Sequence, residues 1–130
     1  MLSLKSALTQ VANWINGIAD YVVEQSISSD GLNGYVKWKS GKLEQWGTDR
    51  FAASSGMAVK KITFAVNFAN TNFNFLITGN NNFTSGVTGL FESNAAANQE
   101  RTVNSTVVRV EKSGGKYIMR FDYRAIGVWK

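Results

Sequence analysis

The spacing of apolar residues changes part-way along the chain, and this change limits the folds that the chain can adopt. Between about Ser3 and Gln25 the apolar residues lie alternately four and three positions apart, which is the period of a coiled-coil helix. After Gly34 apolar and polar residues alternate, which is the period of a β-strand. Residues that form turns separate the two patterns. The sequence therefore predicts a helical segment at 1–26, a linker at 27–33 and a β-rich head domain at 34–130.

The helical segment carries a narrow apolar stripe that is expected to join identical chains. The stripe is almost confined to two positions of each heptad, whereas a helix that packs on a sheet carries a broader apolar face. β-Branched residues occupy both core positions, and this pattern favours trimers over dimers. An amphipathic helix lying on its own domain is the alternative. The residues expected at the trimer interface of this coiled coil are Leu4, Leu8, Val11, Ile15, Ile18 and Val22.

The remainder of the chain has strand periodicity, so the fold class is expected to be mainly β. Residues 35–38 and 43–46 alternate in polarity on either side of a turn that contains Gly41, which is the pattern of a hairpin. About six strands of this kind predict an antiparallel sandwich or barrel. The later strands are expected at 59–68, 73–78, 87–91, 102–111 and 116–129.

The composition argues against most classes of enzyme. The chain has no histidine and no cysteine, so it lacks the commonest general base near neutral pH, any thiolate nucleophile and the usual zinc ligands. Its nine carboxylates are scattered, and a glycosidase would need two of them on either side of a bound sugar. A non-enzymatic protein without a metal or cofactor is therefore expected.

The charge and hydropathy give expectations about partners and location. The net charge of +5 comes from lysines and arginines in runs no longer than two, so no nucleic-acid partner is expected. No apolar run approaches the length of about 20 residues that a membrane span needs. The N-terminus also lacks the apolar core of a signal peptide. We expect a soluble protein, made in the cytoplasm, without membrane insertion.

Two motifs in the β-rich segment resemble those of a known family. The stretches GYVKWKSGKLEQWGT at 34–48 and YRAIG at 123–127 resemble the first hairpin and last strand of phage and prophage tail-fibre head domains. The resemblance implies a six-stranded antiparallel β-sandwich similar to that of H-type lectins. It also implies a homotrimer at the fibre tip, made in the bacterial cytoplasm and carried on the virion, that attaches to a bacterial surface glycan or protein receptor. The alternative is a trimerisation and capping module with no ligand of its own.

Polar and aromatic residues in two places are candidates for ligand binding. A loop of asparagines offers amide donors and acceptors for sugar hydroxyls, although Asn is also what a turn requires. Near the C-terminus aromatic rings lie close in sequence to an arginine, a combination typical of recognition surfaces, and Trp129 has the alternative role of capping the sheet. Trp38 and Trp46 are interpreted as packing residues. The candidate ligand-binding residues are Asn80, Asn81, Asn82, Tyr123, Arg124 and Trp129.

Overall fold

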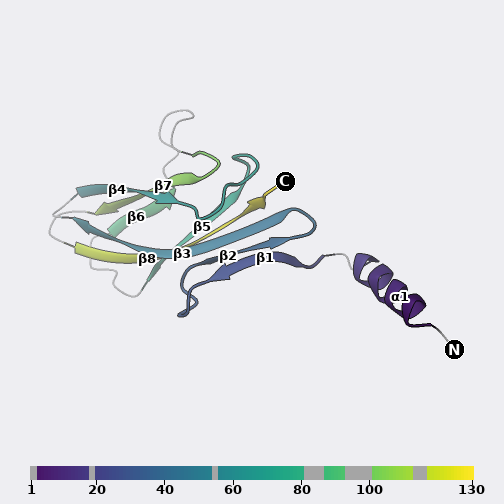
Figure 1. The fold of residues 1–130 in the computed structure, drawn as a ribbon. Helices are drawn as coiled ribbons and strands as arrows, with labels where there is room; N and C mark the ends of the chain where they lie inside the picture. Colours follow the sequence, from purple (N-terminus) through teal and green to yellow (C-terminus); the bar gives the residue numbers. More distant parts are fainter. Residues whose placement is uncertain (1–2, 18–19, 54–55, 81–86, 93–100, 113–116) are drawn as a thin grey trace.

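One helix precedes eight strands in the computed structural model, which describes residues 3–17, 20–53, 56–80, 87–92, 101–112 and 117–130 (Figure 1). The strand pairings that these residues make are antiparallel. The chain is therefore mainly β with one N-terminal helix, which confirms the predicted fold class at this level. The elements are α1 (Leu4–Gly17), β1 (Val22–Ile27), β2 (Gly34–Trp38), β3 (Lys42–Ala53), β4 (Gly56–Thr63), β5 (Asn74–Asn80), β6 (Val87–Glu92), β7 (Ser105–Lys112) and β8 (Tyr117–Val128).

The helix α1 begins where Ser3 caps it and then projects away from the sheets (Figure 1). The Ser3 hydroxyl accepts a hydrogen bond from the backbone amide of Ser6 at 3.1 Å, which satisfies an amide that the first turn leaves without a partner. Leu4 and Leu8 on the apolar stripe are 76% and 60% exposed. The alternative of a helix packed on its own domain is therefore not what the structure shows.

The helix is shorter than the sequence predicts. It ends at Gly17, a poor helix former, and residues 22–27 form β1 instead of further helical turns. β1 pairs along β2 at the edge of a sheet, so sheet hydrogen bonds take the place of helical ones for its backbone. The expected helical segment 1–26 is wrong at its C-terminal end, and Val22 lies in a strand rather than on the helical seam.

The segment that was expected as a linker, residues 27–33, is the turn of the hairpin that joins β1 to β2. The Ser28 amide donates to the Asn33 carbonyl at 2.9 Å. Asp30 accepts hydrogen bonds from the Ser28 hydroxyl at 2.6 Å and from the Leu32 amide at 3.0 Å. These bonds give the turn a defined shape. The same turn forms one wall of the candidate site.

The strands form two sheets, with the orders β1-β2-β3-β8-β5 and β4-β7-β6. The predicted hairpin is confirmed, because Tyr35 of β2 lies opposite Gln45 of β3. The structure describes eight strands rather than about six, and one of them is formed by residues 22–27, which were expected to be helical.

The two sheets enclose one hydrophobic core. Leu43 and Phe121 from the larger sheet are fully buried, as are Val108 and Val110 from the smaller one. The rings of Phe51 and Phe121 lie 5.1 Å apart between centroids. Burial of this kind, at about 25 cal/mol per Å² of apolar surface, is the main favourable term for the fold.

The ends of the two family motifs, QWG at 45–47 and AIG at 125–127, have structural roles in this architecture. Gln45 is 2% exposed; its amide nitrogen donates to the Val66 carbonyl at 2.7 Å, and its amide oxygen accepts from the Val66 backbone at 3.0 Å. These bonds hold the segment after β4 on the larger sheet. A Cβ at Gly127 would lie 2.8 Å from the Cβ of Phe73 and 2.9 Å from the Phe68 ring. The motifs therefore hold the segment between β4 and β5 against the larger sheet.

Candidate functional site

The outer face of the five-stranded sheet presents a row of unlike side chains. Side chains alternate between the two faces of a strand, so Leu43 and Gln45 of β3 point into the core whereas Trp46 points outward. Trp46 lies opposite Arg124 of β8, and Arg124 lies opposite Leu76 of β5. The row thus combines an aromatic ring, a guanidinium and an exposed aliphatic side chain.

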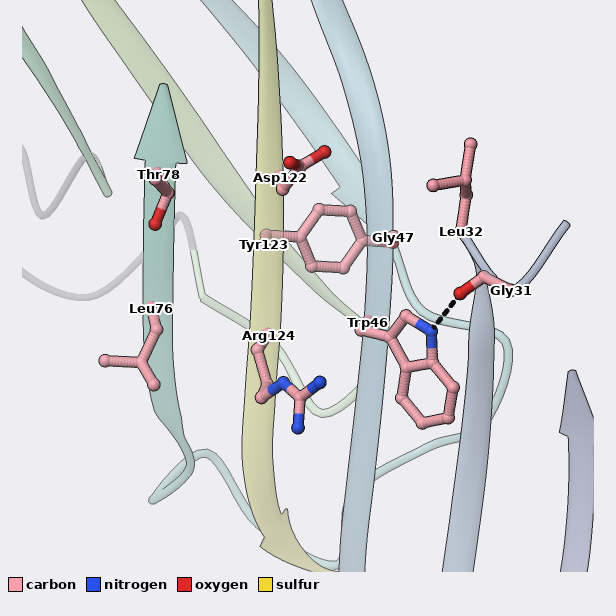
Figure 2. Close-up of a pocket in the computed structure, with 9 residues that line it drawn as sticks. All are labelled: Gly31, Leu32, Trp46, Gly47, Leu76, Thr78, Asp122, Tyr123 and Arg124. Atoms are coloured by element: carbon pink, nitrogen blue, oxygen red, sulfur yellow. Dashed lines mark hydrogen bonds between the residues drawn. The ribbon is translucent and has the colours of Figure 1, made fainter. Parts of the chain in front are cut away.

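A pocket of about 350 Å³ opens on this face (Figure 2). Leu76 and Thr78 of β5 stand on one side, and Gly31 and Leu32 of the β1–β2 turn stand on the other. The volume lies at the lower end of the range of about 300 to 1,000 Å³ for small-molecule sites. The residues between the two sides are Trp46 and Gly47 of β3 and Asp122, Tyr123 and Arg124 of β8.

Trp46 lies next to the β1–β2 turn, and its ring is held in place. The indole nitrogen Nε1 donates to the Gly31 carbonyl at 2.9 Å (Figure 2). The ring covers Gly34, where a Cβ would lie 2.7 Å from Cζ2. A second link joins the turn to β3, because the Thr48 amide donates to the Asn33 side chain at 3.3 Å. Trp46 therefore has two roles, because its ring packs against the turn and also lines the pocket.

Arg124 places a positive charge beside the pocket, and that charge is already paired. Its guanidinium donates to the Glu44 carboxylate, whose side chain is only 12% exposed. The guanidinium carbon also lies 5.6 Å from the centre of the Trp46 ring, within cation–π range. Asp122 lies two residues before Arg124 on the same face of β8 and adds a carboxylate to the lining. The pocket wall thus carries both signs of charge.

Tyr123 extends from β8 toward β3. In Figure 2 its ring reaches Gly47, where a Cβ would lie 2.6 Å from Cζ of the phenol, so glycine leaves the room that the ring needs. The ring stacks on Phe75 with centroids 5.7 Å apart. Burial raises the pKa of the Tyr123 phenol, and the Asp49 carboxylate raises it further.

The polar groups of the pocket can both donate and accept hydrogen bonds. The guanidinium of Arg124 donates, the carboxylate of Asp122 accepts, and the hydroxyl of Thr78 does either. Within the described part of the chain, no group of three or more acidic side chains could hold a metal ion. The arrangement is suited to recognising a small polar ligand.

Two of the candidate ligand-binding residues line this pocket, namely Tyr123 and Arg124. Arg124 lies on the outer face, whereas the Tyr123 ring stacks on Phe75 and packs against the core. Trp129 follows Arg124 by five residues, which corresponds to about 17 Å along the strand at about 3.4 Å per residue. Its Nε1 donates to the Trp38 carbonyl at 2.9 Å, and the Lys37 ammonium lies 5.3 Å from its ring centre. Trp129 thus closes the end of the sheet, and a role for it in binding stays a prediction.

Of the three candidate asparagines, only Asn80 lies among the described residues. Asn80 is the last residue of β5, and its backbone lies opposite Arg120. Asn81 and Asn82 lie outside the described residues, so their role in binding stays a prediction.

Trp46, which was interpreted as a packing residue, also lines the pocket, and six further lining residues were not predicted from the sequence: Gly31, Leu32, Gly47, Leu76, Thr78 and Asp122. The signal for two of them is the alternation of β5, which places Leu76 and Thr78 on the face opposite the core residues Phe75 and Ile77. No pattern in the sequence shows that the β1–β2 turn meets this face.

Three carboxylates of the β1 region have lowered pKa values. Partial burial opposes the ionisation of Asp20, but hydrogen bonds from Ser40 and from the Tyr21 backbone outweigh it and lower its pKa. The Tyr35 hydroxyl donates to Glu24 at 2.8 Å and lowers its pKa. The Ser28 hydroxyl does the same for Asp30.

We therefore expect β1 to loosen in acid. Because these pKa values are lower in the folded chain, the stabilisation is complete at neutral pH and is lost as the pH falls below the ordinary values of 3.8 to 4.5. Amide hydrogen exchange, corrected for intrinsic rates, should show reduced protection in β1 at about pH 3 relative to about pH 6. The amides of Val108 and Val110 in β7 serve as the control and should keep theirs. Equal protection of β1 at both pH values would contradict this expectation.

A comparison with protein families identifies the kind of domain. The family model described as "Putative tail fiber protein gp53-like, C-terminal" matches residues 37–128, which run from within β2 to the end of β8. The chain belongs to this family. The predicted resemblance to tail-fibre head domains is thereby confirmed, and this phage tail-fibre domain is a component of a virion. Among the described residues, no helix is long and apolar enough to cross a membrane.

Solved pyocin tail fibres share the fold of this tail-fibre domain. A C-terminal fragment of the P. aeruginosa R1 pyocin fibre is 14% identical with a TM-score of 0.56, over 98% of this chain and 32% of the fragment. An N-truncated R1-type pyocin tail fibre has the same identity and score over 98% of both chains. An N-truncated R2-type fibre is 16% identical with a TM-score of 0.55, over 98% of this chain and 43% of its own length. The chain thus spans about a third of the R1 fragment. No curated protein sequence matches it.

Proposed function

We propose that this domain is the non-enzymatic receptor-binding tip of a phage-type tail fibre, which attaches as a homotrimer to a glycan or protein on a bacterial surface. The observation that supports a ligand most directly is the open pocket of about 350 Å³ on the outer face of the five-stranded sheet. It combines aliphatic walls with charged and hydroxyl groups, which is the composition of sites that orient small ligands.

The exposed stripe of α1 supports the trimer. Leu4, Leu8, Val11 and Ile15 are between 41% and 76% exposed on a helix that projects from the sheets. Burying such a side chain contributes about 1.5 kcal/mol or more, so a bundle with other copies of the chain is favoured over a solitary helix. Ile18 lies outside the described residues, and its place at the interface stays a prediction.

The second candidate is a module that trimerises and caps a fibre without binding a ligand. It is favoured by the QWG and AIG motifs, because Gln45 and Gly127 serve packing within the chain. This module and the receptor-binding tip differ in one respect: only a tip loses attachment when a pocket residue changes while the assembly stays intact.

The pocket wall gives the test. In a binding assay of the labelled protein on a panel of bacterial strains, Leu76→Asp should weaken attachment about tenfold or more, because loss of an aliphatic contact worth about 1.5 kcal/mol alone corresponds to that factor. Val59→Asp is the matched control, because Val59 on β4 of the other sheet is 57% exposed and Leu76 is 56% exposed.

Val59→Asp should bind cells as the unaltered protein does. Equal binding by both variants would show that the pocket does not bind the ligand. Failure of the unaltered trimer to attach to any strain would instead favour the capping module.

A further inference from the structure

We infer that the edge strand β1 forms a second contact between copies of the chain, in which three heads meet through the exposed apolar side chains of β1 around the axis of the α1 bundle. The inference rests on the proposed trimer and goes beyond it, because it concerns how the heads meet rather than how the helices do. It is supported by the exposure of β1, by its short connection to α1 and by the pairing of its one charge.

The strand β1 has exposed side chains on both of its faces. All six of its residues are exposed, and the exposed fractions of Val22, Val23 and Ile27 lie between 45% and 48%. Among the described residues, nine of the thirteen exposed large hydrophobic side chains lie between Leu4 and Leu32. Exposed apolar surface that gathers in one part of a protein marks an interaction site. The apolar stripe of α1 therefore continues onto the edge of the five-stranded sheet.

The chain between α1 and β1 is too short to carry β1 far from the other copies. The helix ends at Gly17, and the Asp20 carboxylate accepts a hydrogen bond from the Ser40 amide at 3.0 Å. In a bundle whose helix axes lie about 8 to 10 Å apart, the backbone of Gly17 lies within about 8 Å of the threefold axis. Three peptide steps add about 10 Å at most, so Asp20, at the base of β1, lies within about 18 Å of that axis.

The order of the sheet determines which of its edges lies near the axis. β1 forms one edge and β5 the other, with three strands between them (Figure 1). At about 4.8 Å between strands, the two edges are about 19 Å apart. The sheet extends away from β1, which follows the helix, so the edge at β1 is the nearer one. Residues close to a threefold axis face their counterparts in the other copies, so the apolar side chains of β1 have each other as partners.

The contact uses side chains rather than strand pairing. The register of β1 shifts between Val22 and Glu24, and such a bulge hinders the addition of a further strand at an edge. Glu24 is the one charged residue of β1; it lies 3.4 Å from the Lys37 ammonium and accepts from the Tyr35 hydroxyl at 2.8 Å. These bonds hold β1 on β2 and compensate its charge, so the approach of three copies is not opposed.

Single cysteines test the arrangement cleanly, because the chain has none of its own. Gln25→Cys places a thiol on β1, and Asn74→Cys places one on β5; both residues are exposed. They are matched because they lie in one row of paired residues across the sheet, at its two opposite edges. The row consists of Gln25, Val36, Glu44, Ile126 and Asn74.

A short bis-maleimide should join chains of Gln25→Cys at least about tenfold faster than chains of Asn74→Cys at the same micromolar concentration. Thiols held together in one assembly react at an effective concentration of about millimolar, which is the source of this factor. The products should be covalent dimers, because each chain carries one cysteine.

A second pair of variants measures whether the contact stabilises the assembly. Val23→Asp should raise the protein concentration at which the assembly dissociates by about tenfold or more, because three carboxylates would have to approach one another in an apolar contact. Val59→Asp, on β4, should leave that concentration unchanged. Sedimentation equilibrium over a range of concentrations measures both.

The mass of the unaltered protein separates a failure of this inference from a failure of the proposed function. If a particle of about 43 kDa forms, the trimer stands. Equal or slower crosslinking of Gln25→Cys relative to Asn74→Cys, or an unchanged dissociation of Val23→Asp, would then overturn the contact between heads at β1. A particle of 14.3 kDa would overturn the trimer itself, and this inference with it.

Discussion

Replacing Leu8 and Ile15 together by aspartate should separate the assembly into single chains and weaken attachment to cells by about 10² to 10⁴-fold. Both residues lie on the exposed stripe of α1, at 60% and 41% exposure, and each carboxylate would have to be buried without a partner in a helical bundle. Single chains lose the gain in effective concentration that linked binding sites provide, which is the source of the expected factor. Sedimentation velocity and the cell-binding assay measure the two effects.

The matched control places the same charges elsewhere on the helix. Gln10→Asp with Asn13→Asp adds two carboxylates at exposed positions off the stripe, so it should change neither the mass nor the binding. If the stripe variant keeps both the mass and the attachment of the unaltered protein, α1 does not hold the chains together.

Phe121→Ala should lower the free energy of unfolding by about 3 to 5 kcal/mol, the usual cost of removing a buried aromatic ring. Phe121 is fully buried on β8 and contacts Phe51 of the neighbouring strand β3, so the cavity would open between two strands that pair along their whole length. Denaturant unfolding at one fixed protein concentration measures the change, because assembly makes the stability depend on concentration.

Phe91→Ala removes a ring of the same size from a different environment. Phe91 on β6 is 39% exposed, so the cost should be less than about half of that at Phe121. Equal costs at the two positions would show that burial between the sheets does not dominate the stability of the fold.

The sequence predicts local elements well where the pattern of residues is compatible with only one secondary structure. The hairpin at 35–46 follows from alternation around Gly41, whose φ of 101° is the left-handed conformation that favours glycine in a turn. The start of the helix follows in the same way from its periodic stripe, and the two end motifs lead to the family.

The C-terminal end of the helix was predicted wrongly because the pattern of apolar residues there fits both a helix and a strand. Val22 fits the heptad spacing, but it also belongs to a run that pairs with β2. Pairing with β2 at the sheet edge and the hydrogen bonds between Asp20 and Ser40 favour the strand over the helix. Both are contacts between residues far apart in the sequence, so a local pattern does not show them. Gly17 is the one local sign of the break.

The candidate site was predicted only in part for a related reason. Tyr123, Arg124 and Trp129 are close in sequence, but an extended strand places Trp129 at the far end from the pocket. Leu76 joins the site because β5 pairs with β8 in a register that no local pattern reveals. A single sequence shows the faces of strands but not which strands are neighbours.

Sedimentation equilibrium of the unaltered protein at micromolar concentration tests most directly whether the helices join identical chains and present their heads together. We expect three copies of the 14.3 kDa chain, a particle of about 43 kDa. A stable particle of 14.3 kDa would contradict it, because the exposed stripe of α1 would then have no partner chain.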